Sequence, residues 1–126
     1  MVNKEKLYET LGELLYVVAM ADGVIQEEEK KALEEIVENH KWAKDISWSF
    51  KYEENKKNDI DYLYRKVIDS CYELGPQPEY NEFLVAMIKI AEASQDIDAN
   101  ESKIINSFSK DLIEKFKKDI KIEDCL

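Results

Sequence analysis

Glycine and proline are scarce in this sequence, and cysteine is nearly absent. Its 126 residues include three Gly, two Pro and two Cys. So little glycine and proline argues against a turn-rich β-sandwich, and against collagen-like or low-complexity chains. Two cysteines that lie outside any Cys-x-x-Cys pair are too few for a disulfide framework. The composition therefore favours a domain that folds without covalent or metal crosslinks.

The sequence also lacks a long apolar run and an excess of basic residues. Its longest apolar run, residues 14–21, is about eight residues, whereas a membrane-spanning helix needs roughly 20. Lys and Arg number 18 against 28 Asp and Glu, a net charge of −10 at pH 7 that disfavours binding to nucleic acid. The charged N-terminus is unlike a signal-peptide core. We expect a cytoplasmic protein that does not insert into a membrane, and whose acidic surface favours basic partners.

Helical periodicity runs almost from end to end. Apolar residues recur at the spacing of an amphipathic helix in six stretches, and no stretch alternates with period two for long enough to predict a strand. We expect the third helix to end in the polar stretch 53–58, the fourth to stop at Gly75, and a highly charged tail to follow the sixth. The sequence thus predicts a single all-α domain over residues 1–126, a compact bundle of six to seven short helices. The six stretches cover residues 7–18, 25–37, 42–50, 60–71, 80–91 and 104–116.

Residue n resembles residue n+72 through a helix, a loop and the next helix. The loop keeps its length and its Ile-x-x-x-Glu spacing in both copies. This predicts two pseudo-symmetric helix–loop–helix repeats at about residues 7–38 and 79–110, with both loop isoleucines buried. Matched positions include Tyr8 and Tyr80, Leu11 and Phe83, Leu15 and Met87, Val18 and Ile90, Ile25 and Ile97, and Glu29 and Glu101.

A distinctive string at residues 19–29 follows one predicted apolar helix and includes the start of the next. It reads Ala-Met-Ala-Asp-Gly-Val-Ile-Gln-Glu-Glu-Glu. In this string, and over about residues 7–118, the chain resembles the TerB-like domain family. That family includes the bacterial tellurite-resistance protein TerB and the N-terminal domain of membrane-anchored J-domain co-chaperones. The resemblance implies a bundle of about seven short helices, with the motif repeated in both halves and with acidic loop residues that are proposed to bind metal. The second copy, residues 93–101, lacks the Asp-Gly pair and so departs from a symmetric two-loop metal site.

The acidic loops admit two interpretations. In the first, the loop residues only set helix boundaries. Gly23 takes the left-handed conformation that ends a helix, and Glu29 and Glu101 support the start of the next helix. In the second they form a weak site for a hard divalent cation, Ca²⁺ or Mg²⁺, and the fold itself requires no cofactor. An EF-hand is excluded, because its sixth position would be Glu101 instead of Gly. The candidate metal ligands are Asp22, Glu29, Asp96, Asp98 and Glu101.

Motifs for catalysis are missing. The sequence has no Gly-x-Ser-x-Gly elbow, no phosphate-binding glycine loop and no His-Glu-x-x-His pattern. Its single histidine, His40, lies near a helix end, where a solvated or capping role is more typical than a role as a base. Cys71 lies on an apolar stripe and is expected to be buried, not reactive. We therefore expect no enzymatic activity.

Aromatic residues that the repeat does not require are concentrated at residues 42–52. Trp42 and Phe50 fit a core stripe, whereas Trp48 falls off it. Off-stripe aromatic side chains on two helices predict an exposed surface for a protein partner, or for a second copy of the chain in a homodimer. The alternative is that the aromatic residues of the 42–52 segment cover an open end of the bundle. The partner-surface candidates are Trp48, Tyr52, Tyr62 and Tyr72.

The leading hypothesis is a non-enzymatic binding or adaptor module. To this the family resemblance adds a role in tellurite resistance or another stress response. One alternative is a sensor that binds a divalent cation in the acidic loops. A second alternative is a regulatory domain like that of the J-domain co-chaperones.

Overall fold

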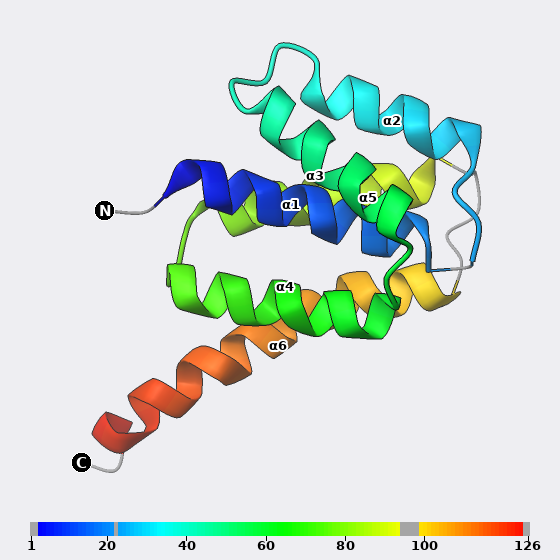
Figure 1. Cartoon of the computed structure of the whole chain (residues 1–126). Coiled ribbons are helices and arrows are strands. Elements are labelled where there is room, and N and C mark those ends of the chain that lie inside the picture. Colours follow the sequence, from blue (N-terminus) through cyan, green and yellow to red (C-terminus); the bar gives the residue numbers. More distant parts are fainter. Residues whose placement is uncertain (1–2, 22, 94–98, 125–126) are drawn as a thin grey trace.

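The computed structural model of the chain describes residues 3–21, 23–93 and 99–124, with residues 118–124 described as backbone only. Within these ranges the chain forms six α-helices and no strand (Figure 1). The predicted all-α class and helical bundle are confirmed. The helices are α1 (Lys4–Ala19), α2 (Glu27–Val37), α3 (Ala43–Lys56), α4 (Ile60–Leu74), α5 (Glu79–Glu92) and α6 (Ala99–Asp124).

Helix α1 is the centre of the bundle. Every residue from Thr10 to Ala19 is buried, and α1 contacts α3, α4, α5 and α6. In Figure 1, α3 lies across the upper side of α1 and α4 runs along its lower side. The segment Leu14–Ala19 is apolar or aromatic at every position, because a helix surrounded by other helices has no face left for solvent.

The core surrounds α1 and takes buried side chains from all six helices. Leu11 of α1, Phe83 of α5 and Phe108 of α6 are each fully buried, and the rings of Phe83 and Phe108 are stacked with centroids 6.4 Å apart. Helix α2 packs against α3 and α5, and α6 packs against α1, α4 and α5. None of the helices in the described ranges is both long enough and apolar enough to cross a membrane.

Helix boundaries follow local chemistry. The side chains of Asn3 and Asp59 accept hydrogen bonds from the backbone N–H groups of the first turns of α1 and α4. Gly75 ends α4 with a φ of +85°, and Gly23 follows α1 with a φ of +94°, as the sequence predicts for both glycines. Helix α3 ends at Lys56, inside the expected polar stretch.

Helix α6 differs from its predicted extent. The charged tail expected after Phe116 continues as helix to Asp124, and this part projects beyond the other five helices (Figure 1). The physical reason is that the tail is rich in Lys, Glu and Asp and has no Gly or Pro to stop a helix.

Burial at the matched positions of the two repeat halves is similar. Leu15 and Met87 are both fully buried, and Glu29 and Glu101 are each only 1% exposed. Ile25 is half-buried against the core instead of fully buried, and Ile97 lies outside the described residues. The repeat therefore stays a prediction, supported by the burial of its helices.

Candidate functional site

Helix α3 carries a pair of exposed aromatic side chains that the packing of the core does not require. Helix α3 turns Ile46, Phe50 and Glu53 towards the interior of the bundle, so its opposite face meets solvent. On that face Trp48 is 60% exposed and Tyr52 is 42% exposed. Their rings stack with centroids 5.3 Å apart and an interplanar angle of 25°. The exposure predicted for Trp48 is thus confirmed, and these residues do not cover an open end of the core.

The other two aromatic candidates, Tyr62 and Tyr72, lie on α4 and differ in solvent exposure. Tyr62 is 56% exposed. Tyr72 is half-buried, since its ring packs against Phe116 of α6 at 5.7 Å and Lys115 lies over it. The structure therefore removes Tyr72 from a freely exposed surface, because α6 covers the side of α4 on which Tyr72 lies.

The predicted loop carboxylates are described only in part. Asp22, Asp96 and Asp98 lie outside the described residues. Glu29 is buried, and its Oε1 accepts a hydrogen bond of 2.7 Å from the backbone N–H of Gln26 at the start of α2. That bond is the helix-supporting role of the first interpretation. Glu101 is equally buried in the first turn of α6.

A different group of acidic residues comes together instead. Within the described part of the chain, Glu5 and Glu9 of α1 and Asp45 of α3 hold carboxylate oxygens within 4.8 Å of one another. Burial raises the pKa of Glu9, and Glu5 and Asp45 raise it further. Glu5 and Asp45 both lie in first turns of helices, where the helix dipole favours negative charge. The dipoles thus favour the negative charges of Glu5 and Asp45, whereas Glu9 lies one turn further along α1.

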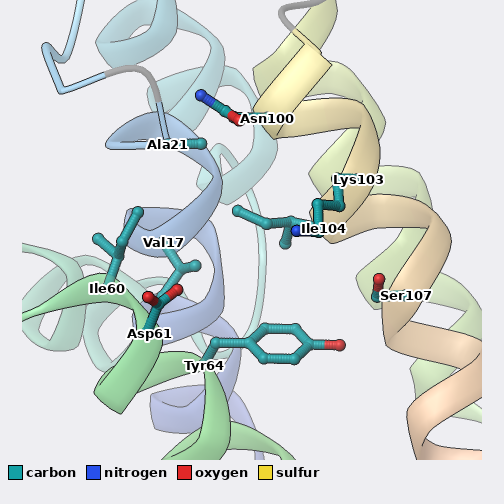
Figure 2. Close-up of a pocket in the computed structure, with 9 residues that line it drawn as sticks. All are labelled: Val17, Ala21, Ile60, Asp61, Tyr64, Asn100, Lys103, Ile104 and Ser107. Atoms are coloured by element: carbon teal, nitrogen blue, oxygen red, sulfur yellow. The ribbon is translucent and has the colours of Figure 1, made fainter.

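A hollow opens between α1, α4 and the first turns of α6, with a volume near 320 Å³. Figure 2 shows Asp61 beside Ile60 and Val17 on one side of the hollow, and Lys103 beside Ile104 on the other side. This volume is at the small end for ligand-binding cavities, and none of the described candidate residues lines the hollow. Its lining consists of Val17, Ala21, Ile60, Asp61, Tyr64, Asn100, Lys103, Ile104 and Ser107.

His40 is neither solvated nor placed as a free base. It is half-buried between α2 and α3, and its Nδ1 accepts a hydrogen bond of 2.9 Å from the backbone N–H of Trp42. Nδ1 therefore carries no proton, and Nε2–H donates to Oε1 of Glu82 on α5 at 2.7 Å. Tyr8 of α1 donates to the other oxygen of Glu82 at 3.0 Å. Of the two roles expected for His40, solvated or capping, the half-buried ring fits the second, because it accepts from the backbone N–H at the start of α3. Its hydrogen bond to Glu82 also joins the α2–α3 loop to α5 and, through Tyr8, to α1.

Cys71 is fully buried on α4, as expected. Burial raises the pKa of its thiol to about 12, so the sulfur stays protonated at neutral pH and is a poor nucleophile. Neither the cysteine nor the histidine of the described chain is thus arranged for covalent or acid–base chemistry.

Sequence comparison places the chain beside one protein family. The family model described as "Tellurite resistance protein TerB" matches residues 8–116, nearly the whole chain. No curated protein and no solved structure matches the chain.

Proposed function

The chain belongs to the TerB family of tellurite-resistance proteins, and from this premise we propose that it is a non-enzymatic adaptor domain in a tellurite or other stress response. It binds a protein partner through the stacked Trp48 and Tyr52 of α3. The observation that carries the proposal is the exposure of this pair on a helix whose other face is fully engaged with the core.

The energetics favour a partner at this position. Trp and Tyr are enriched among residues that dominate protein–protein binding, and an aromatic side chain buries about 150–250 Å² when it is fully covered. Covering the exposed parts of both rings would contribute several kcal/mol at roughly 25 cal/mol per Å². Because the two rings are already stacked, little side-chain entropy is lost on binding.

Two observations support the non-enzymatic part of the proposal. Both ring nitrogens of His40 are engaged in hydrogen bonds. The thiol of Cys71 is buried and protonated at neutral pH. These two residue types serve most often as bases and covalent nucleophiles in enzymes.

Site-specific photo-crosslinking in the source cells tests the proposal. A photoreactive phenylalanine analogue is placed at position 48, at position 52 and, as a control, at position 113, where Ile113 is 54% exposed on α6. We expect positions 48 and 52 to give the same crosslinked product of defined mass, and position 113 to give none. Equal products from all three positions, or no product from 48 and 52, would overturn the proposal.

The variant Trp48→Ala tests whether the Trp48 side chain is needed for partner binding. Because Trp48 is mostly exposed, its truncation leaves the core intact, and surface substitutions of this kind change stability by about 0.5 kcal/mol or less. We expect W48A to keep its melting temperature and to lose the crosslink made from position 52.

A further inference from the structure

The face of α3 that carries the aromatic pair also carries lysines. Positions 44, 48, 51, 52 and 55 recur at the three- and four-residue spacing of one helix face, and all five are exposed. We call this face the α3 stripe. It consists of Lys44, Trp48, Lys51, Tyr52 and Asn55, with Lys56 at its edge. Nζ of Lys56 lies over the ring of Tyr52, 5.7 Å from its centroid.

The charge of this segment is opposite to that of the whole chain. Residues 41–57 contain five Lys and three acidic residues, a local excess of two positive charges in a chain whose net charge is −10. The overall acidity therefore hides a basic and aromatic face.

Two of the three carboxylates of α3 are engaged away from the stripe. Glu53 is 2% exposed, and its Oε1 accepts a hydrogen bond from Asn58 at 3.0 Å. Glu54 pairs with Lys30 of α2 at 3.2 Å. Half-buried Asp45 is the exception, because its spacing from Trp48 and Tyr52 puts it on their side of the helix, at the N-terminal end of the stripe, where it groups with Glu5 and Glu9 of α1. Among the acidic residues of α3, only Asp45 therefore lies beside the stripe, and Lys51 and Lys56 lie beyond it towards the C-terminal end of the helix.

We infer that the α3 stripe binds an acidic segment of a partner protein, rich in Asp and Glu and carrying apolar side chains that cover Trp48 and Tyr52. The inference rests on the proposed function and adds the chemistry of the partner. Charge complementarity selects such a segment, and the rings supply the apolar contact. It also replaces, for this face, the expectation that an acidic surface recruits basic partners.

Extended polyanions fit the stripe less well than a short acidic segment. Helix α3 has 14 residues, so the stripe is about 20 Å long at 1.5 Å per residue. A nucleic acid or an anionic membrane would reach past it to the acidic rest of the molecule, where like charges repel. A single acidic helix or strand matches the length of the stripe.

Peptide binding to the intact chain tests the inference. The probe is a labelled 14-residue peptide of Glu and Leu in helical spacing, and the control peptide has Gln in place of every Glu. Binding is followed by fluorescence anisotropy and by the NMR signal of the Trp48 indole N–H. We expect the Glu peptide to shift that signal, and its Kd to rise with salt.

Matched charge variants locate the contact. We expect K44Q/K51Q to raise the Kd of the Glu peptide at least about tenfold. The variant K89Q/K110Q changes the net charge equally, through exposed lysines of α5 and α6, and should change the Kd less than about twofold. All four lysines are exposed, so neither variant threatens the fold.

Each other outcome overturns the inference. If the Gln peptide binds equally well at Trp48, the stripe is an apolar docking surface, and the proposed function survives without an acidic partner. If neither peptide shifts the Trp48 signal, the inference fails, and crosslinking from position 48 still decides the proposed function. Equal competition by a single-stranded oligonucleotide or by phosphatidylserine vesicles would show a general anion surface. A Trp48 shift that depends only on protein concentration would identify a second copy as the occupant.

Discussion

Gly12 controls how closely α1 and α3 approach each other. A Cβ atom at this position would lie 2.3 Å from the backbone oxygen of Ile46 and 2.8 Å from Cβ of Ser49. Beside this contact, Ser49 Oγ donates a hydrogen bond of 2.6 Å to the backbone oxygen of Glu9. A glycine inside a helix costs about 1 kcal/mol relative to alanine, and here the cost permits the close crossing that places α3 on α1.

Replacing Gly12 with alanine should therefore destabilise the protein although it favours the helix. The clashing oxygen belongs to the backbone of α3, so α3 must move as a whole, and overpacking of this kind costs about 1–3 kcal/mol. Urea unfolding followed by circular dichroism measures the change. The control Asn106→Ala, at an exposed position of α6, should be neutral or slightly stabilising. A Gly12→Ala protein as stable as the wild type would show that the two helices can separate at little cost.

Among the elements, α6 is held to α4 by contacts of unequal strength. The hydroxyl of half-buried Tyr64 donates to Oδ2 of Asp111 at 2.5 Å. Lys115 pairs with Asp69 at 2.9 Å, but the side chain of Asp69 is 62% exposed. A hydrogen bond to a charged group contributes about 1.5–3 kcal/mol, whereas an exposed ion pair contributes about 0–1 kcal/mol. The Tyr64–Asp111 hydrogen bond therefore contributes more to holding α6 against α4 than the Lys115–Asp69 ion pair does.

Tyr64→Phe should cost more stability than Asp69→Asn. We expect Tyr64→Phe to lower the free energy of unfolding by about 1.5–3 kcal/mol, since Asp111 loses its donor. Asp69→Asn should lower it by less than about 1 kcal/mol. Hydrogen exchange should show faster opening of α6 in the first variant alone. Equal losses in the two variants would contradict this ranking.

At the level of elements, periodicity was sufficient to predict the helices, and Trp48 was predictable as exposed because it falls off the apolar stripe of α3. Tyr72 was not predictable, because only the position of α6 reveals that Phe116 covers it. The group of Glu5, Glu9 and Asp45 was missed for the same reason, since two helices far apart in sequence must meet to form it. The lysines of α3 were visible in the sequence, but the net charge of the whole chain concealed their common face.

For the molecule as a whole, buried tyrosines set the response to alkaline pH. Burial raises the pKa values of Tyr8, Tyr64 and Tyr80 above their usual range, and carboxylates beside Tyr8 and Tyr64 raise theirs further. The hydroxyl of Tyr80 donates to the backbone oxygens of Cys71 and Gly75. A hydrogen bond to Glu13 raises the pKa of Lys66 as well. All four groups therefore hold their protons more tightly in the folded chain than in the unfolded chain.

Stability should accordingly fall as the pH rises above about 10. The unfolded tyrosines lose their protons from about pH 10, while the folded ones keep theirs, so the stabilisation is complete below that pH and is lost as the pH rises towards the folded pKa values. Urea unfolding between pH 8 and pH 11 measures the decline. Tyr80→Phe should cost about 1 kcal/mol at pH 8 and should make the decline shallower, because one group fewer titrates. An unchanged slope in that variant would contradict the linkage.

The central position of α1 also has a consequence for the order of synthesis. Of the six described helices α1 is synthesised first, yet the helices that cover it include α4, α5 and α6, which come after α2 and α3. Until they emerge, the apolar segment Leu14–Ala19 can pack against α3 but not against its later partners, and apolar surface exposed in this way is prone to aggregate. The nascent chain can therefore bury only part of its core against α3, and the core is completed only when α1 meets the three later helices, which lie far from it in the sequence.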